Sequence, residues 1–175
     1  MASDSGRMMD RNASKVYQVE FALQDILDVC SEGDSTYRGI AGMQLTMPVE
    51  YKFGELDHIQ RYANAVIRDY NSRHDTRHKK VRVVEGRKSL HKKAYYTHGM
   101  GRITLPQRDS GSWAWRQTVV LHEIAHHLAP CQGHGVEFAE VMLDLLENYV
   151  GLQAGLVYVI LLDKEGITIG RRENV

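Results

Sequence analysis

Residues 119–138 read VVLHEIAHHLAPCQGHGVEF, and this stretch decides both the fold and the chemistry that we expect of the chain. Its apolar residues recur at helical spacing. Within the predicted helix, His122 and His126 lie four residues apart, which places both imidazoles on one face where they can bind one metal ion. Glu123 stands beside them, and its carboxylate can accept a proton from water.

A site with two histidines needs a third protein ligand, with water in the fourth position. Pro130 ends the helix, and a glycine on either side of His134 allows the chain to reverse tightly. We therefore expect His134 to return over the two helix histidines and to complete a site for one Zn²⁺ per chain. The alternatives for the third ligand are Glu137 or Glu140 on the next predicted helix, or the nearby Cys131.

The motif HEIAHH followed by GHGVEF resembles the SprT-like zinc metallopeptidases, whose HExxH helix precedes an HGxxF or HGxxW segment with the third histidine. The resemblance implies a zincin-like fold, a peptide or protein substrate, and zinc ligands at His122, His126 and His134, with Glu123 as general base. The segments MPVEYKFG and RITLP and the run ending in HHLAP are also similar to small uncharacterised actinobacterial (or actinophage) metallohydrolases. That similarity covers most of residues 14–165.

Two departures limit what the resemblance implies. SprT-like proteins often carry a zinc ribbon for DNA, but this chain has only two cysteines, Cys30 and Cys131, so DNA-linked proteolysis is not implied. The metzincin spacing fails as well, because Ala129 and Gln132 stand where it needs Gly and His. The stretch VEFAEVMLDLL is similar to peptidases that cleave phage-type repressors, which leaves a repressor-cleaving regulatory metalloprotein as an alternative.

Periodicity predicts the remaining elements. Apolar residues at helical spacing predict helices over 13–30, 55–71, 113–128, 135–150 and 152–165. Alternation predicts strands over 43–53, 80–85, 93–98 and 102–105, the last two as a hairpin. We expect an α+β single domain in which a small, mainly antiparallel sheet packs against the HExxH helix and flanking helices. Residues 101–105 are the candidate exposed sheet edge for pairing with an extended peptide.

The composition is that of one globular domain. The chain has 175 residues, 43% of them hydrophobic and 25% charged. We expect a disordered lead-in over 1–12, a domain over 13–166 and a C-terminal tail over 167–175. The longest apolar stretch, near 154–162, is too short to cross a bilayer and the start lacks a signal peptide, so we expect a cytoplasmic protein with no membrane contact.

The charge balance excludes a polycation, because 22 Lys and Arg residues match 22 Asp and Glu residues. Residues 68–93, however, hold ten Lys or Arg against three Asp or Glu. We interpret them first as a solvated surface, and a weak contact with nucleic acid or an acidic partner is the alternative. A non-catalytic protein with a structural zinc is a further alternative. Candidate oxyanion-stabilising residues are Tyr96, His98, Arg116 and Tyr149.

Overall fold

The computed structural model describes residues 10–32, 36–87 and 93–170, and these ranges form the α+β domain that the sequence predicts. Its helices are α1 (Ala13–Glu32), α2 (Leu56–His74), α3 (Arg108–Gly111), α4 (Gln117–Leu128), α5 (Val136–Tyr149) and α6 (Leu152–Lys164). Its strands are β1 (Thr36–Ile40), β2 (Met43–Thr46), β3 (Arg82–Glu85), β4 (Tyr95–Thr97) and β5 (Arg102–Leu105).

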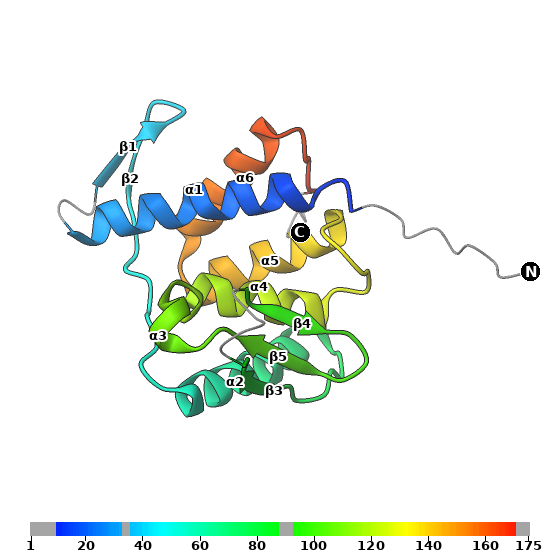
Figure 1. Ribbon diagram of the computed structural model, residues 1–175. Helices are drawn as coiled ribbons and strands as arrows, with labels where there is room; N and C mark the ends of the chain where they lie inside the picture. Colours follow the sequence, from blue (N-terminus) through cyan, green and yellow to red (C-terminus); the bar gives the residue numbers. More distant parts are fainter. Residues whose placement is uncertain (1–9, 33–35, 88–92, 171–175) are drawn as a thin grey trace, which may run out of the picture.

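Helix α4 runs through the middle of the domain (Figure 1). It packs against α5 on one side and against α2 and β4 on the other, while α1 crosses the top of the view and packs against α6. Four apolar side chains of α4 are fully buried, namely Val120, Leu121, Ile124 and Ala125. A helix enclosed in this way leaves only its last turn partly open to solvent, so its buried polar side chains must find partners inside the protein.

The three-stranded sheet has the order β3-β5-β4. Strands β4 and β5 pair antiparallel and confirm the predicted hairpin, whereas β3 pairs parallel to β5. The prediction of 101–105 as an exposed edge is wrong, because β5 is the central strand. Helix α2 fixes β3 on the side of β5 opposite β4. The side chain of Gln60 on α2 donates to the carbonyl of Val81 and accepts from the N–H of Val83, both at 2.8 Å.

The predicted strand over 43–53 is correct only for β2, which pairs with β1 in a separate antiparallel hairpin. Pro48 follows it and has no N–H to donate to a ladder. Directly after Pro48 the apolar alternation does not match burial, since Val49 and Tyr51 are exposed and Glu50 is buried, whereas Phe53 is buried as an inward-facing apolar residue. The carboxylate of Glu50 turns inward because it pairs with Arg116, an interaction that the alternation of apolar residues does not reveal.

The predicted helix over 113–128 begins four residues late, at Gln117, after a short 3-10 turn at Ser112–Ala114. The delay has a backbone cause. The N–H of Phe53 donates to the carbonyl of Trp115 at 2.8 Å, and the N–H of Gln117 donates to the carbonyl of Tyr51 at 2.9 Å. These bonds hold residues 115–117 alongside the extended segment after Pro48, and the helix starts where they end.

The ends of the described chain take part in the domain. Ile167 and Ile169, beyond α6, are buried in the core. Asp10, ahead of α1, contacts His134, whereas residues 1–9 and 171–175 of the predicted lead-in and tail lie outside the described ranges. Cys30 is buried and Cys131 is half-buried, and neither forms a disulfide with a described residue. In the described residues no helix combines the length and the hydropathy that a membrane span needs.

Candidate metal centre

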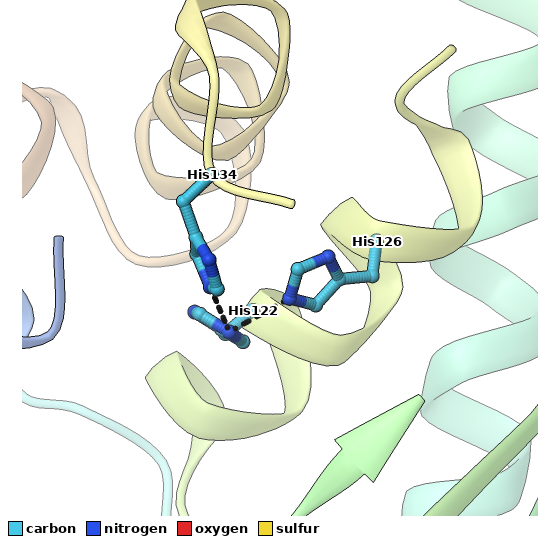
Figure 2. A group of neighbouring side chains, drawn as sticks. All are labelled: His122, His126 and His134. Carbon is cyan, nitrogen blue, oxygen red and sulfur yellow. Dashed lines mark hydrogen bonds between the residues drawn. The ribbon is translucent and has the colours of Figure 1, made fainter. Parts of the chain in front are cut away.

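The turn after α4 carries the third histidine back over the helix (Figure 2). Ala129, the residue before Pro130, is extended with φ −68° and ψ 140°, which ends the helix as the sequence predicts. Gly133 then adopts φ +96°, a conformation that favours glycine. A Cβ atom at Gly133 would also lie 2.9 Å from Oδ2 of Asp10, so the glycine makes room for that carboxylate.

The structure brings the three predicted histidines together. Nε2 of His122 lies 3.1 Å from Nε2 of His126 and 3.2 Å from Nε2 of His134. One ring nitrogen from each of the three lies within 4.8 Å of the other two. His122 and His134 are buried and His126 is half-buried.

Two carboxylates hold the outer nitrogens of this group. Nδ1 of His122 donates to both carboxylate oxygens of Glu20 on α1, at 2.8 and 2.9 Å. Nδ1 of His134 donates to Oδ2 of Asp10 at 2.6 Å, and the backbone N–H of His134 donates to the same oxygen at 3.0 Å. An ionised carboxylate can only accept, so each Nδ1 carries a hydrogen, and Nε2 is the nitrogen that each ring has left to bind a metal ion.

This donor set fits zinc. Two neutral imidazoles whose Nε2 atoms lie 3.2 Å apart repel each other, so a cation lies between these atoms: a proton on His122 in the metal-free chain, or a metal ion that takes its place. Zinc bound tetrahedrally at about 2.0–2.1 Å from each nitrogen separates its ligand nitrogens by about 3.3–3.4 Å, close to the spacing in this group. Carboxylates behind the ligating imidazoles are the usual second partners of zinc-binding histidines. The group contains three protein ligands among the described residues, which leaves a coordination position for water or substrate.

Two aromatic rings enclose the histidines. The ring of Phe138 on α5 is fully buried, and its centroid lies 4.6–4.9 Å from the centroids of all three imidazoles. The ring of Tyr17 on α1 stacks on His122 at 5.4 Å and contacts His134 at 5.0 Å, but it is 43% exposed. Phe138 therefore closes the inner side of the group, and Tyr17 marks the side that is nearer to solvent.

Glu123 is buried beside the group, and the backbone N–H of Tyr96 on β4 donates to its carboxylate. Burial raises the pKa of Glu123 to about 7, against the opposing effect of the nearby His122. A carboxylate with this pKa exchanges a proton with water near neutral pH. The edge strand β4 thus orients the side chain that the sequence predicts as the general base.

The histidines have strongly perturbed affinities for protons in the metal-free chain. Burial lowers the pKa of His122, but the negative charge and the hydrogen bond of Glu20 outweigh it and raise that pKa to about 9. Burial and the neighbouring imidazoles lower the pKa of His126 to about 2 and also lower the pKa of His134. His126 also has a buried Nδ1 without a hydrogen-bond partner among the described residues.

The alternative third ligands do not join the group. Glu137, Glu140 and Cys131 are all absent from the set of residues that converge. His127 faces away from it, as we expect from its position on the helix. Its Nε2 donates to the carbonyl of Lys79 at 2.7 Å, so its Nδ1 accepts the hydroxyl proton of Tyr96 at 2.8 Å.

Two of the four candidate oxyanion-stabilising residues have structural partners elsewhere. The guanidinium of Arg116 pairs with the buried carboxylate of Glu50, and the hydroxyl of Tyr149 donates to Asp69. Tyr96 and His98 lie near the metal centre, the latter with its ring centroid 6.1 Å from that of His126. The position of His98 at the exposed end of β4 keeps it a candidate for contact with substrate.

Glu20 and Asp10 belong to the site although the sequence did not predict them there. A signal for Glu20 exists, because it follows Val16 by four residues and precedes Leu23 by three on the buried stripe of α1. A carboxylate on an apolar stripe needs a partner in the core. Asp10 carries no comparable signal, since it precedes the helix and contacts His134 only through the fold.

Comparison of the chain with protein-family models, with curated proteins and with solved structures finds no match. Its function must therefore be inferred from the residues of the site and their geometry.

Proposed function

We propose that this chain is a zinc-dependent metallopeptidase with a zincin-like fold. The observation that carries the proposal is the convergence of three Nε2 atoms, from His122, His126 and His134, beside the buried carboxylate of Glu123. The resemblance of HEIAHH and GHGVEF to the SprT-like metallopeptidases supports the same reaction class. A purely structural zinc would favour four protein ligands, whereas the described group has three.

The residues of the site have distinct roles in this proposal. His122, His126 and His134 hold the zinc, which when bound supplies Lewis acidity toward water and a peptide carbonyl. Glu123 accepts a proton from the attacking water and delivers it to the leaving amine. The N–H of Tyr96 fixes the carboxylate of Glu123, and Glu20 and Asp10 fix the imidazoles of His122 and His134.

Zinc content and hydrolysis test this proposal separately. Untagged wild-type protein should contain about one zinc per chain by mass spectrometry, and His134→Ala should lose most of it. His127→Ala is the matched control, because it removes a neighbouring imidazole whose nitrogens bind Tyr96 and Lys79 instead. Zinc retained in His134→Ala, or lost equally in His127→Ala, would contradict the three-histidine site.

Glu123→Gln tests the mechanism. The variant keeps the size of the side chain but cannot take up a proton, so it should retain zinc and lose hydrolysis of an unfolded protein such as casein. Hydrolysis at the wild-type rate in this variant would overturn the role of Glu123. The wild-type protein after treatment with a chelator provides the inactive reference.

A further inference from the structure

Two surface cavities border α2, the helix in the lower part of Figure 1, and Arg61 lines both of them. The first has a volume of about 540 Å³, and its walls include Tyr51, Phe53 and Tyr62. The second has a volume of about 650 Å³ and lies between α2 and the segment that leads into β3, with Arg68 and Lys80 in its lining. Because they share Arg61 and both border α2, we call the two cavities together the α2 groove.

The first cavity offers an aromatic surface with fixed geometry. The ring centroids of Tyr51 and Phe53 are 4.9 Å apart, and those of Phe53 and Tyr62 are 5.2 Å apart. Phe53 is buried, the hydroxyl of Tyr62 accepts a hydrogen bond from Gln117 at 2.8 Å, and Tyr51 is 54% exposed. The exposed ring of Tyr51 therefore stands on a rigid base, which suits stacking of a planar ligand.

The charged side chains of the α2 groove are all cations. Arg61, Arg68 and Lys80 line it, and none of its described lining residues carries a carboxylate. Arg61 pairs with the exposed Asp57 at 3.0 Å, but Arg68 and Lys80 form no ion pair with a described residue. A third cavity, between α5 and α6, is lined by four carboxylates: Glu137, Glu140, Asp144 and Glu147. The chain is neutral overall, yet its cavities have opposite charges.

We propose that the α2 groove binds single-stranded nucleic acid, with a base stacked on Tyr51 and backbone phosphates on Arg61, Arg68 and Lys80. An exposed aromatic ring beside a row of cations is the combination that recognises unpaired bases and their phosphates. A duplex would satisfy the cations but keeps its bases stacked inside, out of reach of Tyr51. This site is independent of the zinc site in its residues, so either can exist without the other.

The second cavity also lies beside α4, on the side of that helix that carries His127. The ring of His78, which lines the second cavity, lies 5.9 Å from the ring of His127, and the carbonyl of Lys79 accepts a hydrogen bond from His127. His127 directly follows His126 in α4. A strand bound along the groove would therefore pass beside the helix that carries the histidines.

Fluorescence anisotropy with labelled single-stranded DNA and RNA of about 12 nucleotides tests the proposal, using both chelator-treated and zinc-loaded protein. With three phosphate contacts, a plot of the logarithm of the association constant against the logarithm of the salt concentration should have a slope of about −2. Tyr51→Ala should weaken binding by about 5-fold or more without changing that slope. Arg68→Glu combined with Lys80→Glu should weaken binding at low salt by more than about tenfold and flatten the slope.

Lys164→Glu is the control for charge, since its side chain is exposed, does not line the α2 groove and belongs to α6, which Figure 1 shows at the opposite end of the domain from α2. It should bind like wild type, and thermal unfolding should show that all variants are folded. Absence of binding at low salt would overturn the proposal. Three other outcomes would overturn it too, because each indicates nonspecific adhesion of a polyanion. They are an equal loss of binding in Lys164→Glu, equal affinity for an abasic strand or a duplex of the same length, and no effect of Tyr51→Ala.

Discussion

The carboxylate of Glu20 accepts hydrogen bonds from Nδ1 of His122 at 2.8 and 2.9 Å, although the two residues are 102 positions apart in the sequence. Glu20 lies on the first helix of the domain, and His122 lies at the start of the HExxH motif. Both side chains are almost fully buried. The contact fixes the tautomer of His122, which makes Nε2 the nitrogen that faces His126 and His134.

Glu20→Gln should lower the affinity for zinc by about 10- to 100-fold. The amide loses the negative charge that makes the imidazole of His122 a better ligand, and it offers one acceptor oxygen instead of two. Competition with a chromophoric chelator measures the dissociation constant. Glu32→Gln, at the exposed end of the same helix, should leave the affinity unchanged, and equal affinities in the two variants would show that Glu20 does not support the metal.

Asp10→Asn should weaken zinc binding less, by about 3- to 10-fold. The side chain of Asp10 is 31% exposed whereas that of Glu20 is 8% exposed, so solvent screens the charge of Asp10 more effectively. The same competition assay applies, with Asp25→Asn on the exposed face of α1 as the control. A loss larger than that of Glu20→Gln would mean that Asp10 acts by holding the turn at His134 in place.

The sequence predicts the contacts between residues that are close in the chain, and it misses those between residues that are distant in the chain. His122, Glu123 and His126 share one helical turn, so their spacing alone places them on adjacent faces. His134 was predictable because the helix stop at Pro130 and the turn after it are local effects. The carboxylate of Glu20 reaches the site only because α1 packs across the domain, and a one-dimensional pattern does not specify that packing.

The same reason explains the errors in the sheet. The β4 and β5 hairpin was predictable from a short turn between two alternating segments. The central position of β5 depends on Gln60, whose side chain holds the backbone of Val81 and Val83 against α2. No pattern within β5 itself distinguishes a central strand from an edge strand when both faces are partly apolar.

Removal of zinc should leave the chain folded. The core around α4 consists of buried apolar residues from all the long helices, and they do not depend on a metal for their contacts. Chelator-treated protein should keep its far-UV circular dichroism at room temperature and unfold cooperatively at a lower melting temperature than the zinc-loaded protein. Loss of the helical signal on chelation would instead support the alternative of a structural zinc.

Glu50→Gln should lower the free energy of unfolding by about 1.5–3 kcal/mol, because the buried guanidinium of Arg116 loses its charged hydrogen bonds to Glu50 and keeps only the more exposed carboxylate of Asp28. Oε2 of Glu50 accepts from Nε of Arg116 at 2.8 Å, and Oε1 accepts from the N–H of Thr118 at 2.7 Å, at the start of α4. The glutamine can keep the second bond but not the charge. The same residue thus pairs a buried cation and anchors the helix that carries the HExxH motif.

Chemical denaturation of Glu50→Gln and of Lys52→Ala measures the contribution of this pair. Lys52 forms an exposed ion pair with Asp28 at 2.9 Å, close to Glu50 in sequence, so its loss should cost only about 0–1 kcal/mol. Zinc affinity of Glu50→Gln should also fall if the start of α4 becomes less ordered, whereas Lys52→Ala should bind zinc like wild type. Equal and small stability losses in the two variants would show that Asp28 and solvent are sufficient partners for Arg116 and that the Glu50 pair does not anchor α4.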